Sequence, residues 1–172
     1  GAGAARLLDC CDGDAEDSAL SRLFAYDAAA PGYTGSASHT DWGLLTLVLA
    51  DDVLGDGGAL EFDVDGAWRA AAAPPGALVV NAGDFFALSH AGVRSPRHRV
   101  VLKPTPRLSL VYFFYPDTST PVPEATQDAE VLSLLQCQAP DGECPAPRDA
   151  SFGALIEAKW RQVSRRAAPP GS

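Results

Sequence analysis

Short apolar segments, separated by glycine, proline and aspartate, dominate the chain from residue 22 to residue 115. They cover 22–26, 37–50, 59–63, 67–70, 77–81, 84–88, 98–103 and 107–115. Short strands at this close spacing indicate a β-sandwich or β-barrel and not alternating βαβ units. Asp56-Gly57-Gly58 and Asp65-Gly66 are typical of tight turns between strands. The pattern therefore predicts a mainly β fold.

The C-terminal part follows a different pattern. Residues 116–149 are rich in proline, aspartate, glutamine and threonine, which indicates mostly loop. In 151–166, large side chains recur every three or four residues, as on one face of an amphipathic helix. These side chains belong to Phe152, Leu155, Ile156, Lys159, Trp160 and Val163. We therefore expect a C-terminal helix.

The N-terminal residues resemble neither part, since a short Ala/Leu-rich stretch leads into an acidic run. The chain also contains no methionine, so we expect it to be cut from a longer protein. These patterns predict three regions: residues 1–21 as the remnant of a longer chain, 22–116 as the β core, and 117–172 as a C-terminal loop and helix extension.

Composition excludes several classes of protein. The 172 residues are 47% hydrophobic, enough for one domain with a real core. Thirteen basic and 22 acidic residues give a net charge of −9, which opposes binding to a nucleic-acid backbone. No apolar run is long enough for a transmembrane helix, so we expect no membrane partner.

The cysteines suggest a compartment. They are Cys10, Cys11, Cys137 and Cys144, and they form no zinc-type CxxC pair. Free thiols in a reducing, cytoplasmic environment are the favoured interpretation, and a Cys137–Cys144 bridge is the alternative.

Candidate metal chemistry lies in His39-Thr40-Asp41 and in His98. Residues two apart on a strand face the same way, so His39 and Asp41 would each offer one ligand to a shared ion. Two histidines and one carboxylate leave one face of an octahedral ion open, which suits non-haem Fe(II). Mn(II), Co(II) and Zn(II) also accept such ligands.

Each part of this set has a simpler explanation when taken alone. A single HxD triplet is a weak motif that solvated surface residues produce by chance, and a lone His98 would more often be structural. His90 is a rival ligand, but it lies in a loop-like stretch. The ordered combination of HxD, a distant histidine and then Arg107-Leu108-Ser109 favours a metal site.

Arg107 and Ser109 share one face of the predicted strand with Val111 and Phe113. An arginine on such a face is costly to bury unless an anion meets it. Its planar fork matches a carboxylate in two-point contact, and the Ser109 hydroxyl can donate a further hydrogen bond. The alternative is a structural ion pair between Arg107 and an aspartate.

Four landmarks carry a family resemblance. They are Ser38-His39-Thr40-Asp41-Trp42-Gly43-Leu44-Leu45-Thr46-Leu47, Val79-Val80-Asn81-Ala82-Gly83-Asp84, Ser95-Pro96-Arg97-His98-Arg99-Val100 and Arg107-Leu108-Ser109. Through them, residues 22–116 resemble the C-terminal catalytic half of the Fe(II)/2-oxoglutarate-dependent oxygenases, in the plant-type and isopenicillin-N-synthase-like group.

The resemblance implies a double-stranded β-helix, or jelly roll, around the metal. His39, Asp41 and His98 would bind Fe(II), while Arg107, Ser109 and Tyr26 would hold the distal carboxylate of 2-oxoglutarate. The implied activity is oxidation of an unactivated C–H bond of a small organic substrate by O2, with succinate and CO2 as co-products. Ascorbate is a candidate reductant, and we expect a monomer.

The chain departs from the family pattern in three places. Tyr26-Asp27 stands where the family usually has Tyr-Pro, and Phe24 stands where several plant members have an asparagine that binds the co-substrate. The N-terminal domain of the family is absent. Trp42, Phe85, Phe86 and Leu88 are candidates for either the pocket wall or the core.

Two other functions remain open. The first is an isopenicillin-N-synthase-like oxidase that uses O2 without 2-oxoglutarate and holds a substrate carboxylate at Arg107. The second is a non-catalytic jelly-roll binding module.

Overall fold

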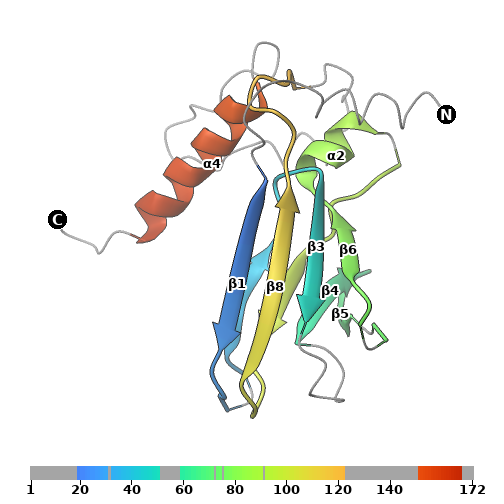
Figure 1. Cartoon of the computed structure of the whole chain (residues 1–172), viewed down its shortest axis with the longest axis vertical. Helices are drawn as coiled ribbons and strands as arrows, with labels where there is room; N and C mark the ends of the chain where they lie inside the picture. Colours follow the sequence, from blue (N-terminus) through green and yellow to red (C-terminus); the bar gives the residue numbers. More distant parts are fainter. Residues whose placement is uncertain are drawn as a thin grey trace.

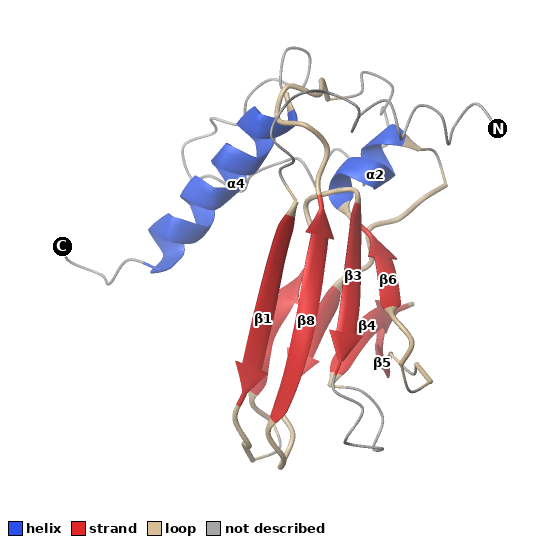
Figure 2. Cartoon of the chain, viewed as in Figure 1, coloured by secondary structure: helices blue, strands red, loops and turns tan. Residues whose placement is uncertain are grey.

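The computed structural model describes residues 19–30, 32–50, 59–71, 73–74, 76–90, 92–122 and 151–167. Two sheets face each other, and two helices lie at one end of them (Figure 1, Figure 2). The strands are β1 (Leu20–Tyr26), β2 (Thr34–His39), β3 (Leu45–Ala50), β4 (Leu60–Val64), β5 (Ala67–Ala70), β6 (Val79–Ala82), β7 (His98–Val101) and β8 (Arg107–Phe114). The helices are α2 (Asp84–Ser89) and α4 (Phe152–Ala167).

Neighbouring strands come from distant parts of the sequence. One four-stranded sheet has the order β1-β8-β3-β6, and the other has the order β2-β7-β4-β5. All of their pairings are antiparallel. The predicted mainly β jelly roll with a C-terminal helix is confirmed.

The sequence pattern was wrong in two places. The segment 37–50 is not one strand, because β2 ends at His39 and β3 begins only at Leu45. The segment 84–88 is helical and forms most of α2. A short apolar run does not distinguish a strand from a buried helical turn, which explains the second error. The predicted turn at 56–58 and all four cysteines lie outside the described residues.

Two groups of apolar side chains form the core. Between the sheets, Leu60 and Val100 pack with Ala59 and contact Val48 and Val79 from the opposite sheet. At the helical end, a second group joins strand ends to α2 and α4. It consists of Leu44, Phe85, Leu88, Val122, Phe152 and Leu155. Neither described helix is long and apolar enough to cross a membrane.

Strand β8 turns its polar face inward. Arg107, Ser109 and Val111 are buried, whereas Leu108 and Leu110 are 48% and 46% exposed. The alternation predicted for this strand is therefore observed, with the arginine and serine on the side of the barrel interior. A buried arginine beside a buried serine needs a polar or anionic neighbour, since a desolvated charge is costly on its own.

Strands β4 and β5 are joined by the predicted turn at Asp65-Gly66. Both residues have positive φ, 53° and 79°, as a type I′ hairpin turn requires. Asp63 Oδ1 also accepts a hydrogen bond of 2.9 Å from the Gly66 N–H. The turn thus depends on residues that tolerate the left-handed conformation.

Gly66→Ala is expected to lower the free energy of unfolding by about 1 kcal/mol, because a Cβ is unfavourable at this φ. An added Cβ would meet nothing within 4 Å, so the cost is conformational and not steric. Urea unfolding of the wild type and the variant measures the difference. Asp65→Asn is the control, because asparagine also tolerates positive φ. Equal stability of Gly66→Ala and the wild type would contradict the prediction.

Candidate metal centre

The three predicted metal ligands lie together. His39 ends β2 and His98 begins β7, and the antiparallel register of these strands places them opposite each other. Their ring centroids are 4.4 Å apart. Asp41 lies two residues beyond His39, in the loop before β3 and not on a strand as predicted. One ligand atom from each residue can be chosen so that all three lie within 4.8 Å of one another.

Backbone carbonyls orient both imidazoles. His39 Nδ1 lies 2.7 Å from the carbonyl of Ala37, and His98 Nδ1 lies 3.1 Å from the carbonyl of Pro96. A carbonyl can only accept, so Nδ1 carries the proton in each ring. When the ring is neutral, Nε2 then has the free lone pair, the arrangement that is common in metal-binding histidines.

Both lone pairs face the Asp41 carboxylate. His39 Nε2 lies 3.7 Å from Asp41 Oδ1, and His98 Nε2 lies 3.6 Å from Oδ2. Both distances are longer than the donor–acceptor distance of a hydrogen bond. Two ligands at about 2.1 Å from one ion can be up to about 4.2 Å apart, so both separations suit a shared cation. The donor set of two imidazoles and a carboxylate therefore fits a divalent metal such as Fe(II).

Burial keeps His98 in the form that can bind a metal. Desolvation lowers the pKa of His98 below its usual 6.5, although the negative charge of Asp41 opposes this shift. His98 is therefore neutral at physiological pH. The His39 side chain is 42% exposed, against 8% for His98, so the centre is accessible from the His39 side.

Asn81 supports Asp41 and was not predicted to have a role. Its Nδ2 donates a 3.0 Å hydrogen bond to Asp41 Oδ2, and both side chains are buried. The sequence signal was present, since Asn81 is part of the Val79–Asp84 landmark, but nothing in the spacing links it to Asp41. Outer-shell partners of this kind orient metal ligands.

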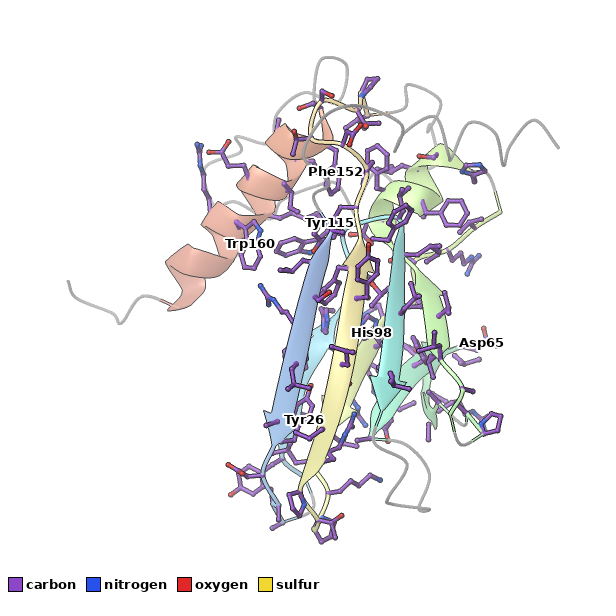
Figure 3. All side chains as sticks on the ribbon, in the orientation of Figure 1. Tyr26, Asp65, His98, Tyr115, Phe152 and Trp160 are labelled. Carbon is purple, nitrogen blue, oxygen red and sulfur yellow. The ribbon has the colours of Figure 1, made fainter. Side chains whose placement is uncertain are left out.

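The predicted anion-binding residues meet where β1 pairs with β8. Tyr26 is opposite Arg107, and Phe24 is opposite Ser109. The Arg107 guanidinium lies 4.9 Å from the centre of the Tyr26 ring. Figure 3 places Tyr26 toward the strand ends remote from the helices, with His98 closer to them. The two candidate subsites therefore lie at different heights along the barrel.

Tyr26 stays protonated at neutral pH. Burial raises the pKa of Tyr26 above 10, and the positive charge of Arg107 only partly offsets this effect. Its hydroxyl can therefore donate a hydrogen bond to an anion held by Arg107. Phe24 stands where several plant members of the resembled family have an asparagine. Its ring stacks on that of Tyr26, with ring centroids 6.0 Å apart.

Tyr115 is a second partly buried phenol, near the other end of the barrel. Desolvation and the charge of Asp41 raise the pKa of Tyr115 to about 12. The folded state therefore keeps a proton that the unfolded state releases near pH 10. This contribution to stability is fully present below pH 10 and is lost as the pH rises toward 12.

Tyr115→Phe is accordingly expected to lose less stability than the wild type between pH 10 and pH 12. Thermal midpoints measured across this range, with tyrosinate absorbance as a second readout, test the effect. Tyr33→Phe, which changes an exposed tyrosine, should behave as the wild type does. Parallel pH curves for Tyr115→Phe and the wild type would contradict the assignment.

The side chains predicted as pocket-wall candidates or as a rival metal ligand pack against other side chains. Phe85 and Leu88 belong to the buried group at the helical end, and the Phe86 side chain packs against it. The Trp42 ring contacts Trp160 of α4, with centroids 5.1 Å apart. His90 follows α2, and its ring lies 4.8 Å from that of Phe86. Within the described residues, the metal-ligand cluster contains His39, Asp41 and His98 and does not include His90.

A jelly roll that gathers two imidazoles and a carboxylate has the architecture of the non-haem iron oxygenases. Residues 21–116 match the 2OG-Fe(II) oxygenase superfamily, and the chain belongs to this family. The family implies Fe(II) and 2-oxoglutarate, together with O2 and a small-molecule substrate.

Curated relatives match part of the chain. The chain is 47% identical to gibberellin 20 oxidase 1 of Oryza sativa subsp. japonica over 90 residues, which are 51% of this chain and 23% of the relative. It is 34% identical to an Arabidopsis thaliana homoarginine-6-hydroxylase over 131 residues, which are 73% of this chain and 36% of the relative. The chain thus spans about a quarter to a third of the length of these relatives.

Solved structures show the same fold. The dioxygenase for auxin oxidation 1 from Arabidopsis thaliana, in its complex with 2-oxoglutarate, superposes with a TM-score of 0.56 at 29% identity. That similarity covers 65% of this chain and 44% of the other. JOX2 in complex with 2OG, Fe and JA gives a TM-score of 0.64 at 24% identity, covering 93% of this chain and 43% of the other.

Proposed function

We propose that this chain carries the catalytic centre of an Fe(II)/2-oxoglutarate-dependent dioxygenase. The enzyme would oxidise an unactivated C–H bond of a small organic substrate and release succinate and CO2. The observation that carries the proposal is the pair of histidine Nε2 atoms that face Asp41 at 3.7 and 3.6 Å. Lone pairs and a carboxylate that converge at these distances repel one another unless a cation lies between them.

His39, Asp41 and His98 would hold Fe(II), which when bound supplies the activation of O2. The carbonyls of Ala37 and Pro96 orient both Nε2 atoms toward Asp41, and Asn81 holds one oxygen of Asp41. With these three protein ligands, a bound ion would keep positions open for a chelating co-substrate and O2.

Arg107, Ser109 and Tyr26 would hold the distal carboxylate of 2-oxoglutarate. The support for this assignment is burial of the Arg107 and Ser109 side chains on the inner face of β8, with Tyr26 directly across from Arg107. A guanidinium fork can bind a carboxylate through two hydrogen bonds, and the protonated phenol and the hydroxyl each add one donor.

The substrate is a separate matter. The names of the two relatives refer to different compounds, a gibberellin and homoarginine. The similarity therefore supports a shared cofactor chemistry and does not identify one substrate. Ascorbate as the reductant that maintains ferrous iron, and a monomeric protein, belong to the same proposal.

Turnover of 2-oxoglutarate to succinate tests the proposal without knowledge of the substrate. The purified chain is incubated in air with Fe(II), ascorbate and 2-oxoglutarate, and succinate is quantified. Succinate formation that requires Fe(II) and is lost in His98→Ala is expected. If the folded chain binds Fe(II) but forms no succinate, the oxidase that needs no 2-oxoglutarate becomes the better explanation.

A further inference from the structure

Helix α4 lies beyond residues 21–116, yet it contacts the segment that carries Asp41. Phe152 and Leu155 anchor its first turn in the apolar group at the helical end. One turn further on, the Lys159 side chain is only 9% exposed, and its Nζ lies 2.6 Å from Asp84 Oδ2. Asp84 itself has no exposed surface. Charged side chains are rarely buried to this extent unless they are paired.

Asp84 connects this ion pair to the metal-binding segment at two points. Thr40, which lies between His39 and Asp41, donates a 3.2 Å hydrogen bond from its hydroxyl to Asp84 Oδ2. The backbone N–H of Asp84 donates a 2.7 Å hydrogen bond to the Asp41 carbonyl. The side chain and the backbone of one residue thus restrain two consecutive residues of the His39–Asp41 triplet.

The neighbouring backbone contacts reinforce this connection. The N–H of Phe85 lies 3.1 Å from the carbonyl of Gly43, so the first turn of α2 binds the loop that follows Asp41. The approach is close enough that a Cβ at Gly83 would collide with the Gly43 carbonyl, and one at Gly43 would collide with the Tyr115 ring. Both glycines of the sequence landmarks are therefore required by packing.

Helix α4 also contacts the loop directly. Trp160 packs edge to face against Trp42, and Lys159 Nζ lies 5.7 Å from the centre of the Trp42 ring. Figure 3 shows Trp160 on the side of α4 that faces the sheet. Thr40 is connected to α4 through Asp84, whereas Trp42 contacts α4 directly.

We propose that Lys159 and Asp84 are positioning residues for the metal centre. Lys159 holds the Asp84 carboxylate, Asp84 holds Thr40 and the backbone of Asp41, and the Asp41 side chain is thereby kept facing both histidines. Within the described residues, Asp84 Oδ1 has no hydrogen-bond partner, so this carboxylate depends on Lys159 and Thr40 through its other oxygen. Without Lys159, the Asp84 carboxylate would be a buried charge with no compensating cation. It would turn toward water, and the hydrogen bond that restrains Thr40 would be lost. The inference rests on the metal site proposed above.

Two variants test the inference with Co(II) alone as the probe. Lys159→Met removes the charge, and Thr40→Val removes the hydroxyl without leaving a charge unpaired. Each is expected to bind Co(II) about tenfold more weakly in a calorimetric titration, as outer-shell substitutions do. Each should also change the ligand-field absorption of the saturated Co(II) complex, because the Asp41 carboxylate shifts. Lys159→Arg, which restores a cation opposite Asp84, is expected to recover most of the affinity.

Arg161→Gln is the matched control on the same helix. Arg161 forms an exposed i,i+4 ion pair with Glu157, far less buried than the Lys159–Asp84 pair, so Co(II) affinity and spectrum should not change. Thermal unfolding of each metal-free variant reports whether it is folded. If Lys159→Met does not fold, Thr40→Val decides the question.

The outcomes separate the two claims. Failure of the folded wild-type chain to bind Co(II) would contradict the proposed metal site itself. Binding by the wild type with unchanged affinity and spectrum in the folded variants would overturn the positioning role alone.

Discussion

Replacing His98 with alanine is expected to weaken Fe(II) binding more than about 100-fold, beyond the range for outer-shell changes. His98 is the most deeply buried imidazole of the site, and its Nε2 lies 3.6 Å from Asp41. Its loss leaves two ligands, one of them on the exposed side of the centre. Anaerobic equilibrium binding of Fe(II) to the wild type and to His98→Ala gives the ratio of dissociation constants.

His90→Ala is the matched control for this prediction. The chain has 3 histidines, and His90 is the one outside the cluster, packed near Phe86 after α2. The variant should bind Fe(II) as the wild type does. Equal Fe(II) affinity in His98→Ala and His90→Ala would show that the ligand assignment is wrong.

Replacing Arg107 with alanine is expected to raise the dissociation constant for 2-oxoglutarate by about 30-fold or more. Truncation of one partner in a buried, hydrogen-bonded charge pair costs about 2–5 kcal/mol, and every 1.4 kcal/mol is about tenfold in affinity. Fe(II) affinity should remain close to that of the wild type, because Arg107 is not a metal ligand. Arg107→Lys should recover only part of the loss, because lysine keeps the charge but not the planar fork.

Arg99→Gln separates a local effect of Arg107 from a general loss of positive charge. Arg99 pairs with Glu61 at 2.8 Å and stacks on Trp68, away from the inner face of β8. Its removal should leave the dissociation constant for 2-oxoglutarate unchanged. Similar weakening in Arg99→Gln and Arg107→Ala would point to long-range electrostatics in place of a carboxylate site.

Local patterns in the sequence predicted a large part of this arrangement. The periodic apolar residues of 151–166 predicted α4, and the Asp65-Gly66 pair predicted a turn whose positive φ angles few residue types adopt. The HxD triplet and the distant His98 were expected to share one site, and the structure brings their side chains together. Each of these signals depends on residue types at short spacing or on a motif of the resembled family.

Contacts between distant segments could not be predicted in the same way. Lys159 was visible as a charged residue on the apolar face of the predicted helix, but its partner Asp84 lies 75 residues earlier. The loop containing Asp41 was taken for strand, because no pattern in the sequence shows that its carbonyls accept hydrogen bonds from α2. Tertiary hydrogen bonds decided that conformation.

Hydropathy alone also did not predict which face of β8 points into the barrel. Leu108, Leu110 and Tyr112 would be the core face by hydropathy, yet they are exposed while Arg107 and Ser109 are buried. Because burying an arginine is costly, its inward position is the reason for proposing an anion site on this strand.

An anaerobic Fe(II) titration of the folded chain, with and without 2-oxoglutarate, shows whether one centre in this chain holds both components. A weak visible charge-transfer band that needs both Fe(II) and 2-oxoglutarate is expected. The band should be absent in His39→Ala and should require much more 2-oxoglutarate in Arg107→Ala. A folded chain that binds Fe(II) yet gives no such band at saturating 2-oxoglutarate would show that the proposed cofactor site is wrong.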